Sequence, residues 1–175
     1  MKPLVALSLS IGILAGFATW LSLTIGLLVW AVFLAWASFY HCGGDVNALK
    51  NSIINNIFGC VLGWIAALLI VTIPAPGLVL RAAIVVGVTV IVLVMAANIK
   101  AFSAIPSGFY GYAATFAFLL MTKDALTVSA MTKPNMQNGL VAVVVAMAIG
   151  NVFGIVSAKL SAAMQPAPKT TPKHA

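Results

Sequence analysis

Residues 3–44 read PLVALSLSIGILAGFATWLSLTIGLLVWAVFLAWASFYHCGG and contain no Asp, Glu, Lys or Arg. A single helix of that length would be about 63 Å long. The hydrocarbon core of a bilayer is only about 30 Å thick, so about 20 residues are enough to cross it. The stretch therefore predicts two membrane spans joined by a tight turn, because a soluble domain cannot bury so long an uncharged segment.

The composition of the whole chain also indicates an integral membrane protein. Hydrophobic residues make up 63% of the 175 residues and charged residues 6%, and the mean hydropathy is +1.15. Soluble domains carry about 25% charged residues. The apolar runs are continuous, whereas the strands of a transmembrane barrel alternate apolar and polar residues. We therefore predict an all-α membrane protein surrounded by the lipid bilayer.

Breaks in the apolar pattern divide the chain into six predicted transmembrane helices. The clearest breaks are residues 41–45, 74–77 and 122–137, which are rich in glycine, proline or polar side chains. The predicted helices cover residues 4–20, 23–41, 50–73, 78–98, 104–121 and 138–159. They form one transmembrane domain over residues 1–160, followed by a proline-containing segment, 161–175, that we expect to be a disordered cytoplasmic tail.

The basic residues predict the orientation of these helices. The net charge is +7, but the nine Lys and Arg residues are scattered singly between apolar segments, which does not fit a nucleic-acid-binding patch. On one side of the predicted topology lie Lys2, Lys50, Lys100, Lys159, Lys169 and Lys173, and on the other Arg81, Lys123 and Lys133. The excess of basic residues on the cytoplasmic side of membrane proteins then predicts that both termini are cytoplasmic.

Matches between the two halves of the chain suggest an internal repeat. A shift of 91 residues places Gly59 on Gly150 and Gly63 on Gly154, and a shift of 82 places Gly26 on Gly108. Each half, about 4–73 and 78–159, holds three predicted helices, so the halves would have opposite orientations, as in many transporters and channels. Chance similarity is the alternative, because apolar helices share Ala, Val and Gly freely.

Three GxxxG motifs predict close contacts between helices. Small residues one turn apart allow two helix backbones to approach, and membrane helices associate largely through such packing. The six candidate packing residues are Gly12, Gly16, Gly59, Gly63, Gly150 and Gly154. They can pack within one chain or form the contact surface of a homo-oligomer, and the sequence leaves both readings open.

Polar side chains inside the predicted helices are the candidates for a functional site. An amide in hydrocarbon costs several kcal/mol unless it finds a partner, so we expect the asparagines to face the interior. They either bond to neighbouring helices or line a path for a small neutral solute. The candidate path residues are Asn55, Asn56, Asn151, Tyr112 and Thr115. Residues 105–108, IPSG, precede the last two and read either as a broken helix that lines a cavity or as an ordinary helix start.

The sequence offers no catalytic constellation. The only carboxylates are Asp45 and Asp124, both at the ends of predicted helices, so no acid is available for ion coupling at the bilayer centre. The two cysteines, Cys42 and Cys60, lack the spacing of metal ligands. We therefore expect a protein that is not an enzyme and uses no cofactor or metal.

Three stretches of the chain resemble a known protein family. They are residues 12–20 (GILAGFATW), 26–35 (GLLVWAVFLA) and 105–117 (IPSGFYGYAATFA). They are similar to a family of small bacterial inner-membrane proteins known only as a domain of unknown function, and the resemblance covers about residues 4–160. It implies a multi-pass protein of the bacterial inner membrane and supplies no site residues.

Two functions fit these features. The first is a passive channel or facilitator for a small uncharged solute, based on the repeat, the interrupted fifth helix and the absence of coupling carboxylates. The second is a non-transporting scaffold or accessory subunit, in which glycines and asparagines serve packing alone. A continuous polar path through the bundle would favour the first function, and a dry, sealed interior would favour the second.

Overall fold

The computed structural model describes residues 1–74 and 77–166. Helices joined by turns and loops are the only regular secondary structure in this part of the chain. Its α-helices are α1 (Pro3–Ile25), α2 (Val29–His41), α3 (Val46–Thr72), α4 (Leu78–Met95), α5 (Ile105–Met121), α6 (Val128–Met131) and α7 (Gly139–Ala163). Two short 3-10 helices, η1 (Ala96–Asn98) and η2 (Lys100–Phe102), connect α4 to α5. The predicted all-α class is confirmed for these residues.

Four helices are long and apolar enough to cross a membrane, namely α1, α3, α4 together with η1, and α7. The other two apolar helices are shorter, with 13 residues in α2 and 17 in α5. At about 1.5 Å per residue they are about 20 and 26 Å long, less than the hydrocarbon core. The six predicted spans therefore correspond to four full-length helices and two short ones.

The boundary between the first two helices differs from the prediction of 4–20 and 23–41. The first helix, α1, runs on to Ile25, and α2 begins only at Val29. Gly26 adopts the left-handed conformation with φ 74°, and the N–H of Leu27 bonds to the carbonyl of Ser22 at 2.8 Å. A glycine in this conformation is a common helix end. The prediction was wrong because residues 20–23 contain no glycine or proline to stop the helix earlier.

The ends of α3 and α7 also extend beyond the predicted limits. Helix α3 starts at Val46 rather than at 50, because the side chain of Asp45 caps it by accepting the N–H of Ala48 at 2.7 Å. Helix α7 continues to Ala163, so the predicted disordered segment 161–175 begins inside a helix. The rest of that prediction, residues 167–175, lies outside the described residues, as do residues 75–76 of the predicted proline break.

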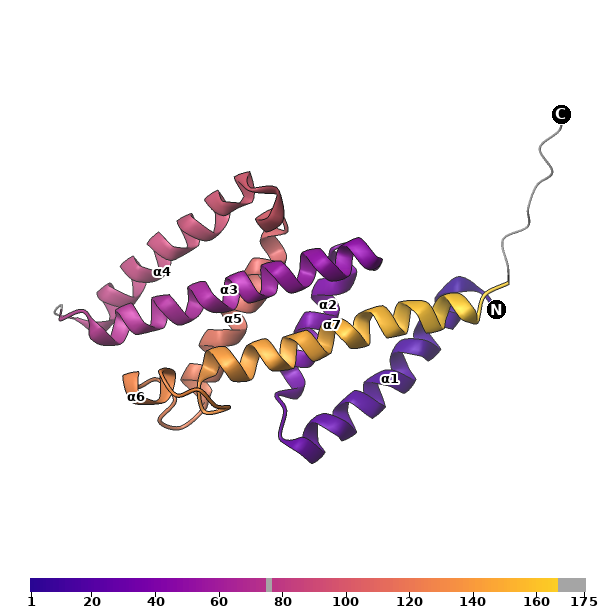
Figure 1. Cartoon of the computed structure of the whole chain (residues 1–175), viewed down its shortest axis with the longest axis horizontal. Helices are drawn as coiled ribbons and strands as arrows, with labels where there is room; N and C mark the ends of the chain where they lie inside the picture. Colours follow the sequence, from indigo (N-terminus) through magenta and orange to yellow (C-terminus); the bar gives the residue numbers. More distant parts are fainter. Residues whose placement is uncertain (75–76, 167–175) are drawn as a thin grey trace.

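Two long helices form the middle of the molecule and two short helices cross them (Figure 1). The long helices α3 and α7 run antiparallel through the middle of the molecule, and the short helices α2 and α5 cross them. The main contacts of α2 are with α7, and those of α5 are with α3. On the outside, α1 packs against α7 and α4 packs against α3. The N-terminus and the end of α7 lie at the same end of the molecule (Figure 1).

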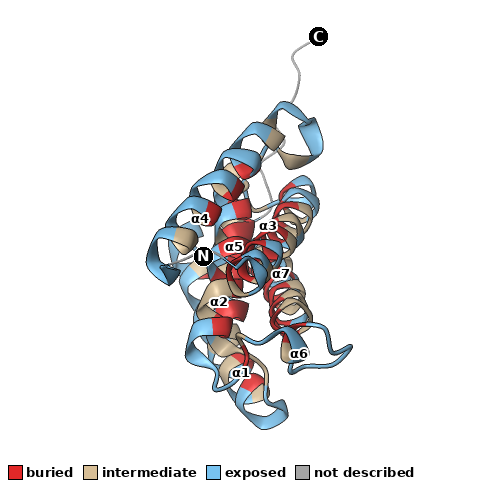
Figure 2. Ribbon diagram, turned by 90° about the vertical axis from the view of Figure 1, so that its left-hand side faces the viewer, coloured by how far each residue is buried: buried red, intermediate tan, exposed pale blue. Residues whose placement is uncertain are grey.

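The interior is built mainly from α2, α3, α5 and α7. Figure 2 shows the buried residues gathered where α3, α5 and α7 meet. In α3 and α7, 50% of the residues in an apolar stretch of 18 residues are buried, compared with 17% in α1 and α4. The exposed faces of α1 and α4 are apolar, as expected of helices that contact lipid tails. The central four helices are therefore the place to look for a functional site.

Candidate functional site

A buried polar cluster lies where α2, α3, α5 and α7 meet. None of its members is more than 1% exposed. The members are Ser38 of α2, Ser52 and Asn56 of α3, Ser107 of α5 and Asn151 of α7. The cluster is thus an uncharged polar region enclosed by apolar helices.

Asn56 is the centre of this cluster. Its Nδ2 donates to Ser38 Oγ at 3.0 Å and to the carbonyl oxygen of Ser107 at 2.9 Å. Its Oδ1 accepts from Asn151 Nδ2 at 2.9 Å. One amide of α3 therefore joins the three other central helices, α2, α5 and α7.

A chain of hydroxyl groups extends the cluster toward the end of α2. Ser38 Oγ donates to Ser107 Oγ at 2.8 Å and lies 2.7 Å from Ser52 Oγ. Ser107 Oγ in turn lies 3.1 Å from Cys42 Sγ. Because Cys42 follows the last residue of α2 and is partly exposed, this chain of polar groups leads from the middle of the bundle to its edge.

Asn151 is only partly satisfied within the cluster. Besides the bond to Asn56, its Nδ2 donates to the carbonyl of Met147 at 3.0 Å. Its Oδ1 is buried and has no hydrogen-bond partner among the described residues. A buried acceptor without a partner costs about 1–3 kcal/mol. A water or a small neutral molecule with an O–H or N–H group can supply the missing bond.

The structure brings together only two of the five predicted path residues. Asn56 and Asn151 are bonded to each other. Asn55 is equally buried, but its Nδ2 donates to the backbone carbonyls of Asn51 at 2.8 Å and Ala101 at 3.1 Å. It therefore ties α3 to η2 and does not belong to the cluster.

Tyr112 and Thr115 also lie outside the cluster. The hydroxyl of Tyr112 lies 2.8 Å from Thr89 Oγ1 and so contacts the peripheral helix α4. Thr115 Oγ1 donates to the carbonyl of Gly111 in its own helix at 3.0 Å. The three serines of the cluster were missed from the sequence. Ser52 lies four residues before Asn56 on the same helix face, and this spacing is a signal that would have found it.

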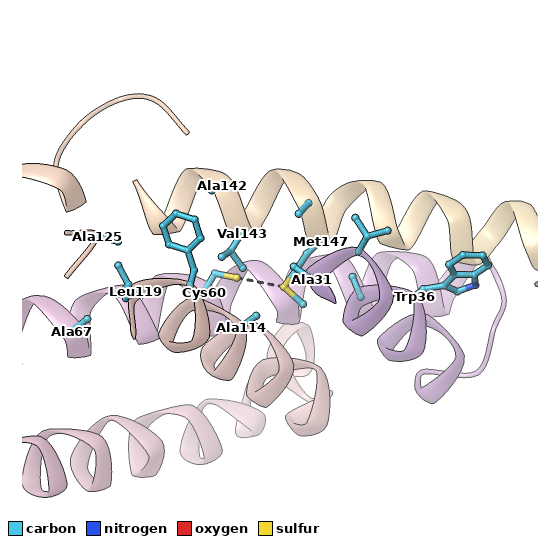
Figure 3. Packing of buried hydrophobic residues seen from close by; sticks show 14 of the residues in the cluster. Ala31, Trp36, Cys60, Ala67, Ala114, Leu119, Ala125, Ala142, Val143 and Met147 are labelled. Atoms are coloured by element: carbon cyan, nitrogen blue, oxygen red, sulfur yellow. Dashed lines mark hydrogen bonds between the residues drawn. The ribbon is translucent and has the colours of Figure 1, made fainter. Parts of the chain in front are cut away.

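Toward the connection between α5 and α7 the interior is apolar. Cys60 Sγ donates to Met147 Sδ at 3.7 Å, and Leu119 and Val143 lie beside this contact (Figure 3). These four side chains are at most 1% exposed. They separate the polar cluster from residues 122–138. The cluster is thus sealed on this side, and no continuous polar path crosses the described part of the bundle in this conformation.

Four of the six predicted packing glycines lie where helix backbones touch. A Cβ atom at Gly59 would lie 1.9 Å from the carbonyl oxygen of Gly108, and one at Gly150 would lie 2.1 Å from that of Val32. Both distances are far below van der Waals contact, so only glycine fits. Glycine at these two positions brings α3 against α5 and α7 against α2.

The second glycine of each motif lies one turn further along the same contact. A Cβ at Gly63 would lie 3.0 Å from the carbonyl oxygen of Tyr112, and one at Gly154 would lie 2.6 Å from Cδ1 of Phe39. Gly12 and Gly16 differ, because a Cβ there meets nothing within 4 Å. These two exposed glycines make no close helix contact among the described residues.

The glycine contacts also give the sequence offset between the positions of α2 and α5 that make them. Gly59 and Gly150 are 91 residues apart, and their partners Gly108 and Val32 are 76 apart. Helix α5 also begins 76 residues after α2, at Ile105 against Val29. The predicted shift of 82 for these two helices is therefore not the one their packing follows.

A second polar contact ties the outer helix α1 and α2 to α7. Ser157 Oγ lies 3.0 Å from Trp36 Nε1 and 2.7 Å from the hydroxyl of Tyr40. Ser157 Oγ donates to the carbonyl of Gly154 at 2.7 Å, so the tyrosine is the donor to Ser157. Ser10 of α1 donates to the backbone carbonyl of Ser157 at 2.6 Å. This site has every polar group paired and is structural.

The part of the chain that the structure describes contains no group of side chains that could bind a metal ion. No three His, Cys, Asp or Glu side chains there are placed to hold one ion. Both Cys42 and Cys60 are free thiols. The chemistry available at the polar cluster is therefore hydrogen bonding by neutral amide and hydroxyl groups.

Comparison with known proteins places the chain among bacterial membrane proteins. "Inner membrane protein YcdZ" of Escherichia coli (strain K12) is 29% identical over 118 residues, which cover 67% of this chain and 71% of that protein. The protein of the same name from Salmonella typhimurium (strain LT2) is 29% identical over 118 residues, 67% of this chain and 72% of its own. No solved structure matches this chain.

The homology and the apolar helices agree on location. The relatives are named as inner-membrane proteins, and four helices of this chain are long enough to cross a bilayer. The protein is therefore a multi-pass protein of the bacterial inner membrane. The family model described as "Protein of unknown function (DUF1097)" matches residues 8–162. Because this match covers most of the sequence, the chain belongs to the DUF1097 family.

Proposed function

We propose that the protein is a passive channel or facilitator for a small uncharged solute, whose path is closed in this conformation. The observation that carries the proposal is the unpartnered Oδ1 of Asn151 within a buried polar cluster. A solute with an O–H or N–H donor would satisfy this oxygen. The amide of Asn56 and the hydroxyl of Ser38 offer further donors and acceptors nearby.

The preference for a neutral solute follows from the absence of charge in the cluster. Its members are serines and asparagines, so an ion would lose its hydration without meeting an opposite charge. The two carboxylates of the chain, Asp45 and Asp124, lie outside the long helices, next to α3 and after α5. Without a buried carboxylate we expect no coupling to a proton gradient.

Opening of the path would require movement of the apolar layer. Cys60 and Met147 close the interior next to Asn56 and Asn151. The two side chains meet through their sulfur atoms, 3.7 Å apart, and the Met side chain is flexible, so this contact can be displaced. A facilitator of this type would conduct only when these side chains separate.

We also propose that the two halves of the chain are inverted repeats. The exchange of partners supports this, because α1 and α2 of the first half pack on α7, while α4 and α5 of the second half pack on α3. The opposite directions of α3 and α7 (Figure 1) are those of an inverted repeat. The paired offsets of 91 and 76 residues at the glycine contacts add to this support.

A scaffold or accessory subunit is the second candidate. The observation that favours it is the sealed interior, in which Asn56 uses both its donor and its acceptor within the protein. In that case the polar cluster would hold the four central helices in register and no solute would enter. Transport measurements separate the two candidates.

Permeation is expected to follow the concentration gradient of the solute and to depend on Asn151. Proteoliposomes would be mixed with an excess of urea, glycerol or another small neutral solute, and their swelling followed by stopped-flow light scattering. The change Asn151→Leu removes the Oδ1 acceptor and should abolish the protein-dependent rate. The matched control is Asn98→Leu, an exposed asparagine whose side chain bonds only to Met95 in the α4–η1 segment.

The outcome of this experiment decides between the candidates. Uptake driven uphill by a pH gradient would contradict passive permeation. If no solute of the panel crosses faster than through protein-free vesicles, the facilitator proposal is wrong and the scaffold stands.

We propose further that both termini are cytoplasmic. The N-terminus and the end of α7 lie at the same end of the molecule (Figure 1), and Lys2, Lys50, Lys100 and Lys159 lie on the side that the charge bias assigns to the cytoplasm. Reporter fusions after residue 175 and within residues 122–136 should give opposite locations. Finding both on the same side would contradict the six-span topology, in which α7 separates the two fusion sites.

We also propose that the protein forms a homo-oligomer through α1. Gly12 and Gly16 lie one turn apart on an exposed face of α1, and a Cβ atom at either would meet nothing within 4 Å among the described residues. A GxxxG face that its own chain does not use is available to the helix of a second copy. Cross-linking of single cysteines placed at these two positions would detect such a contact.

A further inference from the structure

A polar hollow lies between the start of α3 and the connection from α4 to α5. It is lined by Asn47, Lys50, Asn51, Ile54, Lys100 and Ala101. Both lysines belong to the side assigned to the cytoplasm. The hollow is separate from the polar cluster, so the inference drawn from it rests on the proposed orientation of the chain but not on the proposed solute path.

Two contacts hold together the backbone segments that carry Lys50 and Lys100. Asn55 of α3 donates to the carbonyl of Ala101 at 3.1 Å. The rings of Phe58 and Phe102 pack with their centroids 4.5 Å apart. These two contacts fix η2 against α3 and thereby fix the backbone of Lys100 near that of Lys50. The backbone of the hollow is therefore held in place by the packing of η2 against α3.

Within residues 1–74 and 77–166, no carboxylate lies against the charge of the hollow. Asp45 and Asp124 are the only carboxylates of the protein. Asp45 does not line the hollow, and its side chain caps α3 by accepting the N–H of Ala48. Asp124 follows α5 in the connection at the opposite end of that helix. Two lysines that share one hollow repel each other, so an anion from outside the chain would stabilise this arrangement.

We propose that this hollow binds the phosphate of an anionic phospholipid headgroup. Lys50 and Lys100 supply positive charge, and the amides of Asn47 and Asn51 supply N–H donors for the remaining phosphate oxygens. Ile54 lines the hollow, and Ile99, beside Lys100, is 58% exposed. These apolar side chains offer a surface for the acyl chains, which a free phosphate ion would not use. Basic pockets at the cytoplasmic ends of membrane helices bind headgroups in this way.

The test is lipid retention by the full-length protein in detergent micelles, measured by native mass spectrometry. The probes are phosphatidylglycerol and, for comparison, zwitterionic phosphatidylcholine. The double variant Lys50→Gln, Lys100→Gln should bind phosphatidylglycerol on the order of thirtyfold more weakly, given the usual effect of each surface lysine on anionic lipid. The matched control is Lys2→Gln, Lys159→Gln, which removes the same charge on the same side and should keep the affinity.

A stability control and a competition experiment complete the test. Thermal unfolding of the double variant should occur at or above the temperature of the parent, since both lysines are exposed and their removal relieves the repulsion between them, so a loss of binding is not a loss of fold. Equal retention of phosphatidylglycerol by the parent and the double variant would overturn the proposal. So would a control that loses as much affinity. If inorganic phosphate displaces the lipid at equal concentration, the ligand is a free phosphate and the lipid assignment is wrong.

Discussion

Replacing Gly150 by alanine is expected to destabilise the folded protein by about 1–3 kcal/mol, the usual cost of overpacking a tight interior. The added Cβ would lie 2.1 Å from the backbone carbonyl oxygen of Val32. No side-chain rotation can relieve a clash with backbone, so α7 and α2 must move apart. Gly59→Ala should behave alike, because its Cβ would lie 1.9 Å from the carbonyl oxygen of Gly108. Leucine at Gly63 or Gly154 would overpack the same two contacts.

The measurement is thermal unfolding in detergent, with glycines of the outer helices as controls. Gly12→Ala and Gly87→Ala add a Cβ that meets nothing within 4 Å. Alanine is the better helix former by up to about 1 kcal/mol, so these controls should melt at or above the temperature of the parent. If Gly150→Ala melted with the controls, α2 and α7 would not be in contact there.

Asn56→Leu should be the most costly change in the polar cluster, on the order of 1–3 kcal/mol. It removes the amide that bonds to Ser38, to the carbonyl of Ser107 and to Asn151. Those groups stay buried without water to replace the lost bonds, and each such group costs free energy. Leucine has the same number and branching of side-chain heavy atoms as asparagine, so the substitution leaves no cavity and the loss reports mainly the hydrogen bonds.

Asn151→Leu is the comparison that makes this prediction specific. It deletes one donor but also deletes the unpartnered Oδ1, so its cost should be smaller than that of Asn56→Leu. Asn56 Oδ1 keeps a contact with Ser52 Oγ at 3.3 Å. Chemical unfolding of both variants in mixed micelles would give the order. A greater loss for Asn151→Leu would mean that Asn56 is not the centre of the cluster.

The class of this protein could be predicted from its sequence because it depends on local composition. A segment such as 3–44, without a single Asp, Glu, Lys or Arg, must lie within the membrane, whichever helices it packs against. The six apolar helices followed from the same pattern, whereas the four-residue helix α6 and the two 3-10 helices were not predicted. The ends of helices were predicted less well, since they depend on single residues such as Gly26, whose left-handed conformation ends α1, and Asp45, whose side chain starts α3.

The candidate site could be predicted only in part. Burial of the asparagines followed from the cost of an amide in hydrocarbon, and Asn55, Asn56 and Asn151 are each at most 1% exposed. Their partners could not be predicted. Asn55 and Asn56 are adjacent in sequence but differ by about 100° around the helix, so one bonds to η2 and the other to α7.

What the sequence alone determined was the environment of each segment, because hydropathy is a property of consecutive residues. Only the tertiary structure decided which small residues touch. Gly16 and Gly150 both belong to GxxxG motifs, yet one faces open space and the other lies against the backbone of α2. The motif permits close approach without selecting a partner. The partner is selected by the crossing of α2 and α5 over α7 and α3, and that crossing depends on contacts between residues far apart in the chain.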